Sequence, residues 1–298
     1  MQISVLGAPT SAGAYAPGQE RAPAVLRERG LIAALAGAGI AVEDLGDIDG
    51  FRWRLDREHV RRMNAAFVRR GAWQVAGQLG PVLAADQRAL VIGGDCTVEI
   101  GTVAAAAAAG PDFGLIYVDG DADLNTPEST ADGAFDWMGV AHMLGIEGID
   151  RSIVAGFSQA PLLRAEQLLY FGTGIVAPFE RERIAALGIE EIPLDEVRAD
   201  PVAAAEQAVD WASRFERLLV HLDVDVLDYA DFPIAENVRR GIGLRYAELI
   251  ASLGRLVAAP NWQVLTIAEI NPEHCSDVEA QIGRLVGDLA GMLGRAAD

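Results

Sequence analysis

Short runs rich in aliphatic and β-branched residues alternate with longer segments of helical periodicity along nearly the whole chain. The expected strands cover residues 3–6, 40–45, 90–92, 115–118, 153–155, 169–171, 218–224 and 264–268. The expected helices cover residues 22–36, 58–79, 97–109, 177–187, 201–215, 245–257 and 278–293. This alternation predicts an α/β fold, in which a mostly parallel sheet is covered by helices on both faces.

The chain shows no Pro-, Gly- or Ser-rich linker, no internal repeat and no charged tail, so we predict a single domain over residues 1–298. Hydrophobic residues make up 51% of the sequence, which is enough for a large core, but no run approaches the roughly 20 apolar residues of a membrane span. The first residues lack a basic segment, and we expect no signal peptide. Cys96 and Cys275 are too few and too distant for a disulfide framework, which indicates a cytoplasmic location.

Charge narrows the possible partners. The formal net charge is −19, which argues against nucleic-acid binding, because phosphate contacts need clustered cationic side chains. All the basic residues are arginines, and the sequence contains no lysine. Schiff-base lysine chemistry and a phosphate-binding loop of the P-loop type are therefore excluded.

Five aspartates follow two of the expected strands: Asp119, Asp121 and Asp123 after the first, and Asp223 and Asp225 at the end of the second. Within each cluster they are two residues apart, so on an extended chain each set would point to one face. Each like-charge contact at 4 Å costs about 4 kcal/mol at an effective dielectric of about 20. A bound divalent cation is the simplest compensation, and the pattern predicts a metal site.

Two further strand ends carry polar or ionisable groups. Gly93-Gly94-Asp95-Cys96 follows one strand, and Glu269-Ile270-Asn271-Pro272 follows the last. Ligands of open parallel sheets bind at the carboxyl ends of the strands. We therefore expect these segments to meet the aspartate clusters in one site.

The four segments and their order resemble the ureohydrolase family, which includes arginase, agmatinase and formiminoglutamase. Residues 7–9, 21–23 and 26–31 resemble the opening segment of the family. The resemblance implies a three-layer α/β/α fold of the arginase–deacetylase type. It also implies a manganese hydrolase that cleaves C–N bonds of guanidines or amidines, acts on a small cationic substrate and forms homo-oligomers, either trimers or hexamers.

The resemblance implies metal ligands at six positions: Cys96, Asp119, Asp121, Asp123, Asp223 and Asp225. Cys96 and Asp121 stand where the family has histidines. One ion is expected on Asp119, Asp121, Asp223 and Asp225, and a second on Cys96, Asp119, Asp123 and Asp223, with unequal affinity, so that either one or two ions bind. Oxygen-rich ligands favour a hard ion, either Mn2+ or Mg2+. Cys96 is alternatively a neutral buried thiol.

The same comparison assigns catalytic and substrate-binding roles. Glu269 is expected to pair with the guanidinium, and Asp225 or Asp136 to pass a proton to the departing amine, Asp136 standing where the family has a histidine. Asn125 and Thr130 are expected to bind substrate. His221 is expected to hydrogen-bond a ligating carboxylate, with direct metal ligation as the alternative.

Two features bear on the substrate. Ala177 replaces the acid that holds the α-amino group in arginases, which argues against free arginine bound in the usual way. Residues 125–128 (Asn-Thr-Pro-Glu) and Cys96 are similar to N-hydroxyarginine hydrolases of the same family, although these keep a histidine at the position of Asp121. The alternative function is a silent ureohydrolase fold that serves as a binding or assembly subunit, since the histidine ligands are replaced.

Overall fold

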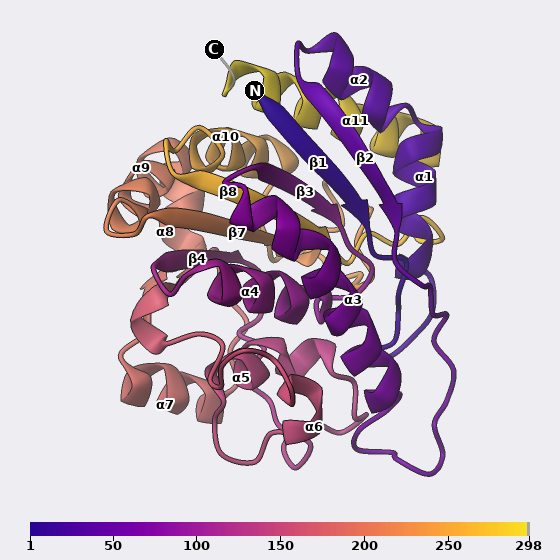
Figure 1. The fold of residues 1–298 in the computed structure, drawn as a ribbon, viewed down its shortest axis with the longest axis vertical. Helices are drawn as coiled ribbons and strands as arrows, with labels where there is room; N and C mark the ends of the chain where they lie inside the picture. Colours follow the sequence, from indigo (N-terminus) through magenta and orange to yellow (C-terminus); the bar gives the residue numbers. More distant parts are fainter. Residues whose placement is uncertain (297–298) are drawn as a thin grey trace.

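The computed structural model describes residues 1–296 and centres on one sheet of eight strands, all of them parallel (Figure 1). The strand order is β2-β1-β3-β8-β7-β4-β5-β6. The strands are β1 (Gln2–Gly7), β2 (Ala41–Asp47), β3 (Arg88–Ile92), β4 (Phe113–Val118), β5 (Leu168–Phe171), β6 (Glu190–Ile192), β7 (Arg217–Asp223) and β8 (Trp262–Ala268).

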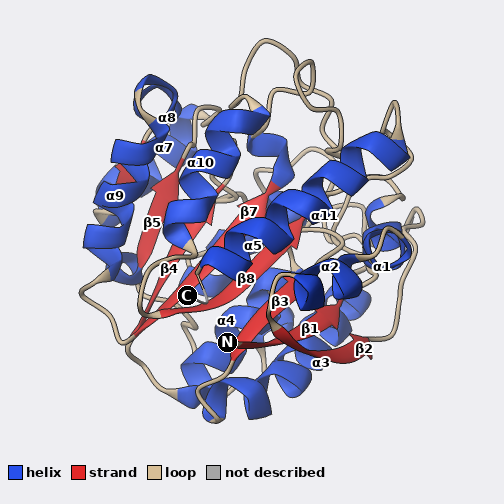
Figure 2. Ribbon diagram, turned by 90° about the horizontal axis from the view of Figure 1, so that it is seen from above, coloured by secondary structure: helices blue, strands red, loops and turns tan. Residues whose placement is uncertain are grey.

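Helices cover both faces of the sheet, which gives three layers (Figure 2). They are α1 (Ala22–Glu28), α2 (Leu31–Gly37), α3 (Ala65–Ala84), α4 (Val98–Ala109), α5 (Gly139–Leu144), α6 (Arg151–Val154), α7 (Pro178–Leu187), α8 (Leu194–Ala199), α9 (Pro201–Ala212), α10 (Tyr246–Leu256) and α11 (Val278–Arg295). None of the helices within residues 1–296 combines the length and the apolar character that crossing a membrane requires.

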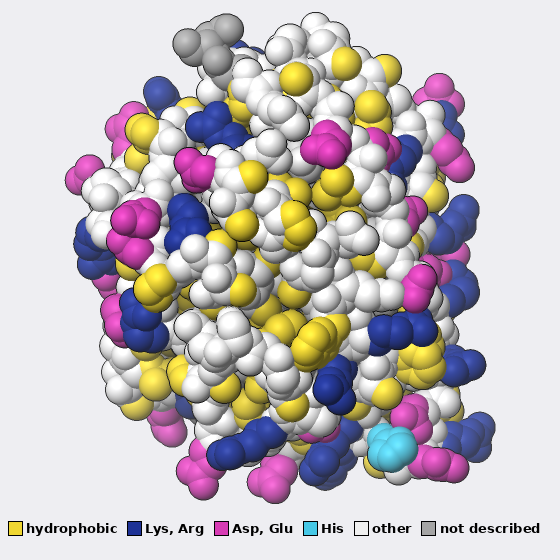
Figure 3. Space-filling model, in the orientation of Figure 1, with side chains coloured by type: hydrophobic (Ala, Val, Ile, Leu, Met, Phe, Trp, Pro, Cys, Tyr) yellow, Lys and Arg dark blue, Asp and Glu magenta, His cyan; other side chains and the backbone are white. Residues whose placement is uncertain are grey.

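Side chains of each strand alternate between two hydrophobic clusters. In β4, for example, Leu115 and Tyr117 pack with α3 to α6, whereas Ile116 and Val118 pack with α8 to α11. A strand whose two faces are both buried reads as a continuous apolar run, which is typical of parallel sheets. The negative charge does not gather into a patch on the face over α3 and α4, where charged side chains lie mainly toward the edges (Figure 3).

The α/β class and the parallel sheet predicted from the sequence are confirmed, but several elements differ. Residues 153–155 were expected to form a strand, yet they lie in and just after α6. Asp150 caps this helix by accepting a hydrogen bond from the Ser152 amide at 3.0 Å. A short apolar run is compatible with a strand and with a buried helix, and here the Asp150 cap favours the helix. The sequence reasoning also missed one strand, β6, and two helices, α5 and α8.

Two helices have boundaries that differ from those expected. The helix expected over residues 22–36 is divided into α1 and α2, because Gly30 adopts a left-handed backbone with φ of 84°. The helix expected from residue 58 begins at Ala65. Before it, the Asp56 carboxylate accepts from the amides of Glu58 and His59 and forms a turn, and Asn64 is left-handed with φ of 56°.

The strand order explains how distant segments of the sequence meet. Strands β3, β8, β7 and β4 are consecutive neighbours in the sheet, so their carboxyl ends lie side by side at one edge. The segments that follow these strands include Cys96, Glu269, Asp225 and Asp119. The convergence of four strand ends predicted from the sequence is confirmed.

Candidate metal centre

Loop geometry, and not strand alternation, brings the aspartates together. Strand β4 ends at Val118 before the first cluster begins, and β7 ends at Asp223. The Asp119 Oδ1 atom accepts a hydrogen bond from the Asp121 amide, and Asp223 Oδ1 accepts one from the Asp225 amide, both at 2.7 Å. These are Asx-type turns. The expectation of side chains aligned on an extended chain was therefore wrong, although the carboxylates do converge.

The loops after β3 and β8 are tied to each other by Glu269. Its Oε1 atom accepts from the Cys96 amide at 2.9 Å, and its Oε2 atom accepts from Gln19 Nε2 at 3.0 Å. Glu269 is 5% exposed and has a left-handed backbone with φ of 64°, which costs of order 1–3 kcal/mol in a non-glycine residue. Burial, and then the charge of Asp95, raise the pKa of Glu269.

Three groups of side chains within the described residues place donor atoms within 4.8 Å of one another, a spacing that can hold a metal ion. They are Asp119, Asp223 and Asp225; Cys96, Asp223 and Glu269; and Cys96, Asp119 and His221. In the first group, Asp119 Oδ2 and Asp225 Oδ1 are buried and have no hydrogen-bond partner. Buried carboxylate oxygens without partners are costly unless something positive binds them. This group therefore fits one oxygen-liganded divalent ion.

Cys96 is a neutral thiol in this arrangement. It is fully buried, and its Sγ donates to Asp223 Oδ2 at 3.0 Å. Burial, followed by the charge of Asp223, raises the pKa of the thiol well above its usual value. Sγ also lies 3.3 Å from His221 Nε2, while His221 Nδ1 lies 3.3 Å from Glu99 Oε2. His221 thus contacts Cys96 and Glu99, and not the ligating carboxylate that we expected. It belongs to the third donor group, and direct ligation of a metal by His221 stays a prediction.

Arg239 is a charged residue of the site that the sequence reasoning missed. Its guanidinium contacts Asp121 through both terminal nitrogens, with NH1 at 3.1 Å from Asp121 Oδ1, and NH2 lies 2.6 Å from Asp225 Oδ2. The pKa of Asp121 is raised to about 7, first by burial and then by the charge of Asp225. The hydrogen bond from Arg239 lowers it in part. The positive charge that the acidic cluster demands is therefore supplied in part by the protein itself.

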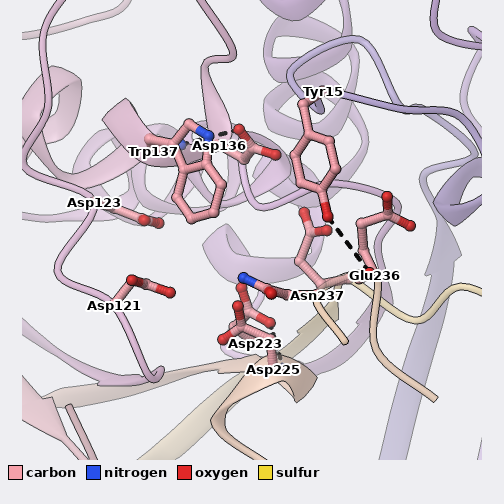
Figure 4. Close-up of a pocket in the computed structure, with 10 residues that line it drawn as sticks. Tyr15, Asp121, Asp123, Asp136, Trp137, Asp223, Asp225, Glu236 and Asn237 are labelled. Carbon is pink, nitrogen blue, oxygen red and sulfur yellow. Dashed lines mark hydrogen bonds between the residues drawn. The ribbon is translucent and has the colours of Figure 1, made fainter. Parts of the chain in front are cut away.

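The remaining acid of the first cluster faces a pocket between the loops (Figure 4). Asp123 is 4% exposed, and its Oδ2 atom accepts from the Tyr117 hydroxyl at 2.6 Å. Asp136 lines the same pocket and is 6% exposed; burial, and then the charge of Glu269, raise its pKa well above its usual value. Asp123 was expected to be a metal ligand, but it lies outside the three donor groups found in the described residues, and a tyrosine hydroxyl binds one of its oxygens.

Two aromatic rings form walls of this pocket. Tyr15 and Trp137 have centroids 6.1 Å apart and planes that differ by 7°, and both face the acids in Figure 4. The Tyr15 hydroxyl donates to the Glu236 carbonyl at 3.5 Å. Flat π-surfaces above a group of carboxylates suit a planar cation. Neither ring was singled out from the sequence, because an isolated aromatic residue in a loop carries no pattern.

Of the three residues expected to bind substrate, Glu269 lines the pocket, whereas Asn125 and Thr130 lie outside the residues that line it. Asn125 Nδ2 donates to Glu180 Oε1 at 3.1 Å, and its Oδ1 accepts from Ser129. The Thr130 hydroxyl donates to Asp132 Oδ1 at 2.8 Å. Both side chains therefore stabilise the loop that ends at Trp137, and their contact with substrate stays a prediction.

Fold and site together define a three-layer α/β/α protein with a buried acidic centre at the carboxyl ends of its central strands. A sequence model of the Arginase family matches residues 1–288, and the chain belongs to this family. The resemblance drawn from the sequence motifs is thereby confirmed.

Individual relatives agree with this assignment. The arginase of Bacillus subtilis (strain 168) is 30% identical over 293 residues, which is 97% of each chain. Arginase-1 of Homo sapiens is 31% identical over 274 residues, covering 91% of this chain and 85% of the human protein. The crystal structure of Bacillus subtilis arginase matches 99% of both chains with a TM-score of 0.87 at 28% identity. The family relatives are hydrolases.

Proposed function

We propose that this protein is a metal-dependent hydrolase that cleaves a C–N bond of a guanidine or amidine and releases urea or a urea-like product. The observation that carries the proposal is the pair of buried, unpartnered oxygens on Asp119 and Asp225, beside the pocket that Glu269 lines. Carboxylate ligands favour a hard cation, and we propose Mn2+, with Mg2+ as the alternative. Membership of the Arginase family supports the reaction class.

The residues that line the pocket suit a small planar cation as substrate. Asp123, Asp136 and Glu269 give it an interior lined with carboxyl groups, and Tyr15 and Trp137 give it flat walls. A guanidinium or amidinium group combines positive charge with planarity. We propose a modified guanidine, such as an N-hydroxyguanidine, because Ala177 offers only backbone and a methyl group where arginases hold an α-amino group.

The residues of the chain have separable roles in such a reaction. A divalent ion on Asp119, Asp223 and Asp225 would supply the Lewis acidity that activates water at neutral pH. Glu269 would pair with the cationic nitrogens of the substrate and fix its orientation. Asp136 is the better placed of the two proton carriers, because Asp225 is held by Arg239 through one oxygen. A protonated Asp136 carboxyl would then pass its proton to the departing amine.

The test is a comparison of the protein as purified and after loading with Mn2+. Metal content is measured by mass spectrometry, and urea or hydroxyurea release is followed over a panel of alkylguanidines and N-hydroxyguanidines. We expect bound metal and release of one of the two products. Absence of both metal and product across the panel would overturn the proposal.

One observation favours a second function. Arg239 binds Asp121 and Asp225, which the resemblance assigned to a metal. A centre compensated by an arginine is compatible with a silent ureohydrolase fold that acts as a binding or assembly subunit. The two functions differ in one result: a silent subunit would bind a guanidine without hydrolysing it, even when loaded with Mn2+.

The assembly and location of the protein complete the proposal. We propose that residues 1–298 act as one domain and form a homo-oligomer, a trimer or a hexamer, in the cytoplasm, without a nucleic-acid or membrane partner. The two cysteines support a reducing compartment, since both are free thiols. Light scattering coupled to size-exclusion chromatography tests the assembly, and a monomer would contradict it.

A further inference from the structure

We propose that Arg239 replaces one divalent ion of a paired centre, so that the protein binds a single ion on Asp119, Asp223 and Asp225. The inference rests on the metal binding of the proposed function, and it does not require that the protein be an active hydrolase. It assigns to Arg239 a positioning role, since the guanidinium fixes two acids and determines where an ion can bind.

The contacts of Arg239 are those of a structural cation. Both terminal nitrogens bind Asp121, and NH2 also binds Asp225 at 2.6 Å. The side chains are largely shielded from water, with exposed fractions of 21% for Arg239, 16% for Asp121 and 6% for Asp225. A guanidinium is a planar fork that can bind two carboxylates at once, and it stays charged at any physiological pH. A divalent ion that bridged Asp121 and Asp225 would have to displace it.

The backbone around Arg239 is fixed in a way that holds this position. The Tyr229 amide donates to the Arg239 carbonyl at 3.0 Å, and the Gly241 amide donates to both carboxylate oxygens of Asp228 at 3.1 Å. The neighbouring Arg240 is exposed, and its guanidinium lies 5.5 Å from the centroid of the Tyr229 ring. Two adjacent arginines thus have different environments, and only the first reaches the acidic centre.

The two oxygens of Asp225 divide the centre into two positions. Oδ2 binds Arg239, whereas Oδ1 is buried and has no partner. Asp119 Oδ2 is likewise buried without a partner, and both residues belong to the donor group that includes Asp223. Asp121 is absent from all three donor groups in the described residues. Arg239 therefore occupies the Asp121 side of the centre, and the unpartnered oxygens of Asp119 and Asp225 leave the other side open to an ion.

The experiment is a Mn2+ count on the full-length protein by mass spectrometry, together with a titration followed by electron paramagnetic resonance. We expect one ion per chain in the wild type and two in Arg239→Gln, because this change frees Asp121 and Asp225. Arg239→Lys, which keeps the charge, and Arg240→Gln, which alters the exposed neighbour, should both bind one. Two ions in the wild type, one in Arg239→Gln or none in either would overturn the inference.

A second measurement covers the case in which Arg239→Gln does not fold. Anomalous scattering from wild-type crystals grown with Mn2+ should show one peak, among Asp119, Asp223 and Asp225. A peak between Asp121 and Asp225 would refute the replacement. Hydrolysis is measured separately. One bound ion without product would refute the proposed reaction and leave the inference about Arg239 intact. Two bound ions with product would refute the inference and leave the proposed reaction intact.

Discussion

Replacing Glu269 with glutamine separates the role of its charge from its role in the fold. In the structure, Oε1 accepts from the Cys96 amide and Oε2 accepts from Gln19 Nε2. In Glu269→Gln, the amide oxygen keeps the bond to Cys96, and the new NH2 group faces Gln19. Gln19 Oε1 is buried and has no partner, so rotation of the Gln19 amide by 180° supplies an acceptor.

The number of hydrogen bonds is therefore conserved, and the free energy of unfolding should change by less than about 1 kcal/mol. Substrate recognition should suffer far more. Loss of one partner of a buried charge pair costs about 3–5 kcal/mol, which corresponds to a decrease in kcat/KM of roughly 150- to 4,000-fold. The assay combines steady-state release of urea or hydroxyurea by the Mn2+-loaded protein with urea-induced unfolding of the same preparation.

Glu273→Gln is the matched control, because Glu273 is 38% exposed and its Oε1 atom accepts from Arg21 at 3.2 Å on the surface. It should change neither measurement. Hydrolysis by Glu269→Gln within fivefold of the wild type would refute the assignment of Glu269 to the substrate cation. A loss of several kcal/mol in stability would refute the rearrangement of Gln19.

Three further predictions test other parts of the molecule. The pKa of the buried His142 is lowered to about 4, chiefly by burial. The unfolded chain therefore binds a proton at His142 before the folded protein does, and the free energy of unfolding should fall by up to about 3 kcal/mol as the pH falls from about 6.5 to about 4. His142→Gln removes this titration, and chemical unfolding at pH 7 and pH 4.5 should show its stability deficit shrinking in acid; a constant deficit contradicts the assignment. Cys96 is fully buried and Cys275 is partly exposed, so iodoacetamide should label only Cys275 in the native protein, and peptide mass spectrometry of native Cys275→Ser should find no label. Trp137→Ala removes an aromatic wall and should raise KM roughly 2- to 30-fold with kcat nearly unchanged, whereas a fall in kcat at constant KM would argue against a binding role.

The convergence of the site residues was predictable because it follows from topology. Cys96 and Glu269 are 173 positions apart, yet a hydrogen bond of 2.9 Å joins the Cys96 amide to the Glu269 carboxylate. In a parallel sheet the carboxyl ends of all strands lie at one edge, so residues that follow strands are candidates for a shared site. The pattern of acids after strands carried this information without any knowledge of strand order.

The geometry within each loop was not predictable in the same way. Asp121 and Asp123 lie beyond the end of β4, and Asp123 has a left-handed backbone with φ of 51°. Period-two reasoning applies only inside a strand. The edge strand β6 was also missed, because Glu190 and Glu191 interrupt the apolar pattern on which strand prediction relies.

Arg239 marks the limit of reasoning from sequence. It lies in an irregular segment 14 residues after Asp225, and nothing in the sequence distinguishes it from Arg240. Only the backbone contacts of the Tyr229–Gly241 region direct one of the two arginines inward. Charge counting indicated that a cation was required, but it could not indicate that the chain would provide one.

The charge balance of the centre changes once Arg239 and Cys96 are placed. From the sequence, five carboxylates and Cys96 were assigned to divalent ions. In the structure the thiol is a neutral donor to Asp223, and Arg239 binds Asp121 and Asp225. The guanidinium fork spans both carboxylates and leaves Asp225 Oδ1 free, whereas a lysine would supply the same charge as a compact ammonium. The arginine thus holds Asp121 and Asp225 while it leaves the unpartnered oxygens of Asp119 and Asp225 open to an ion.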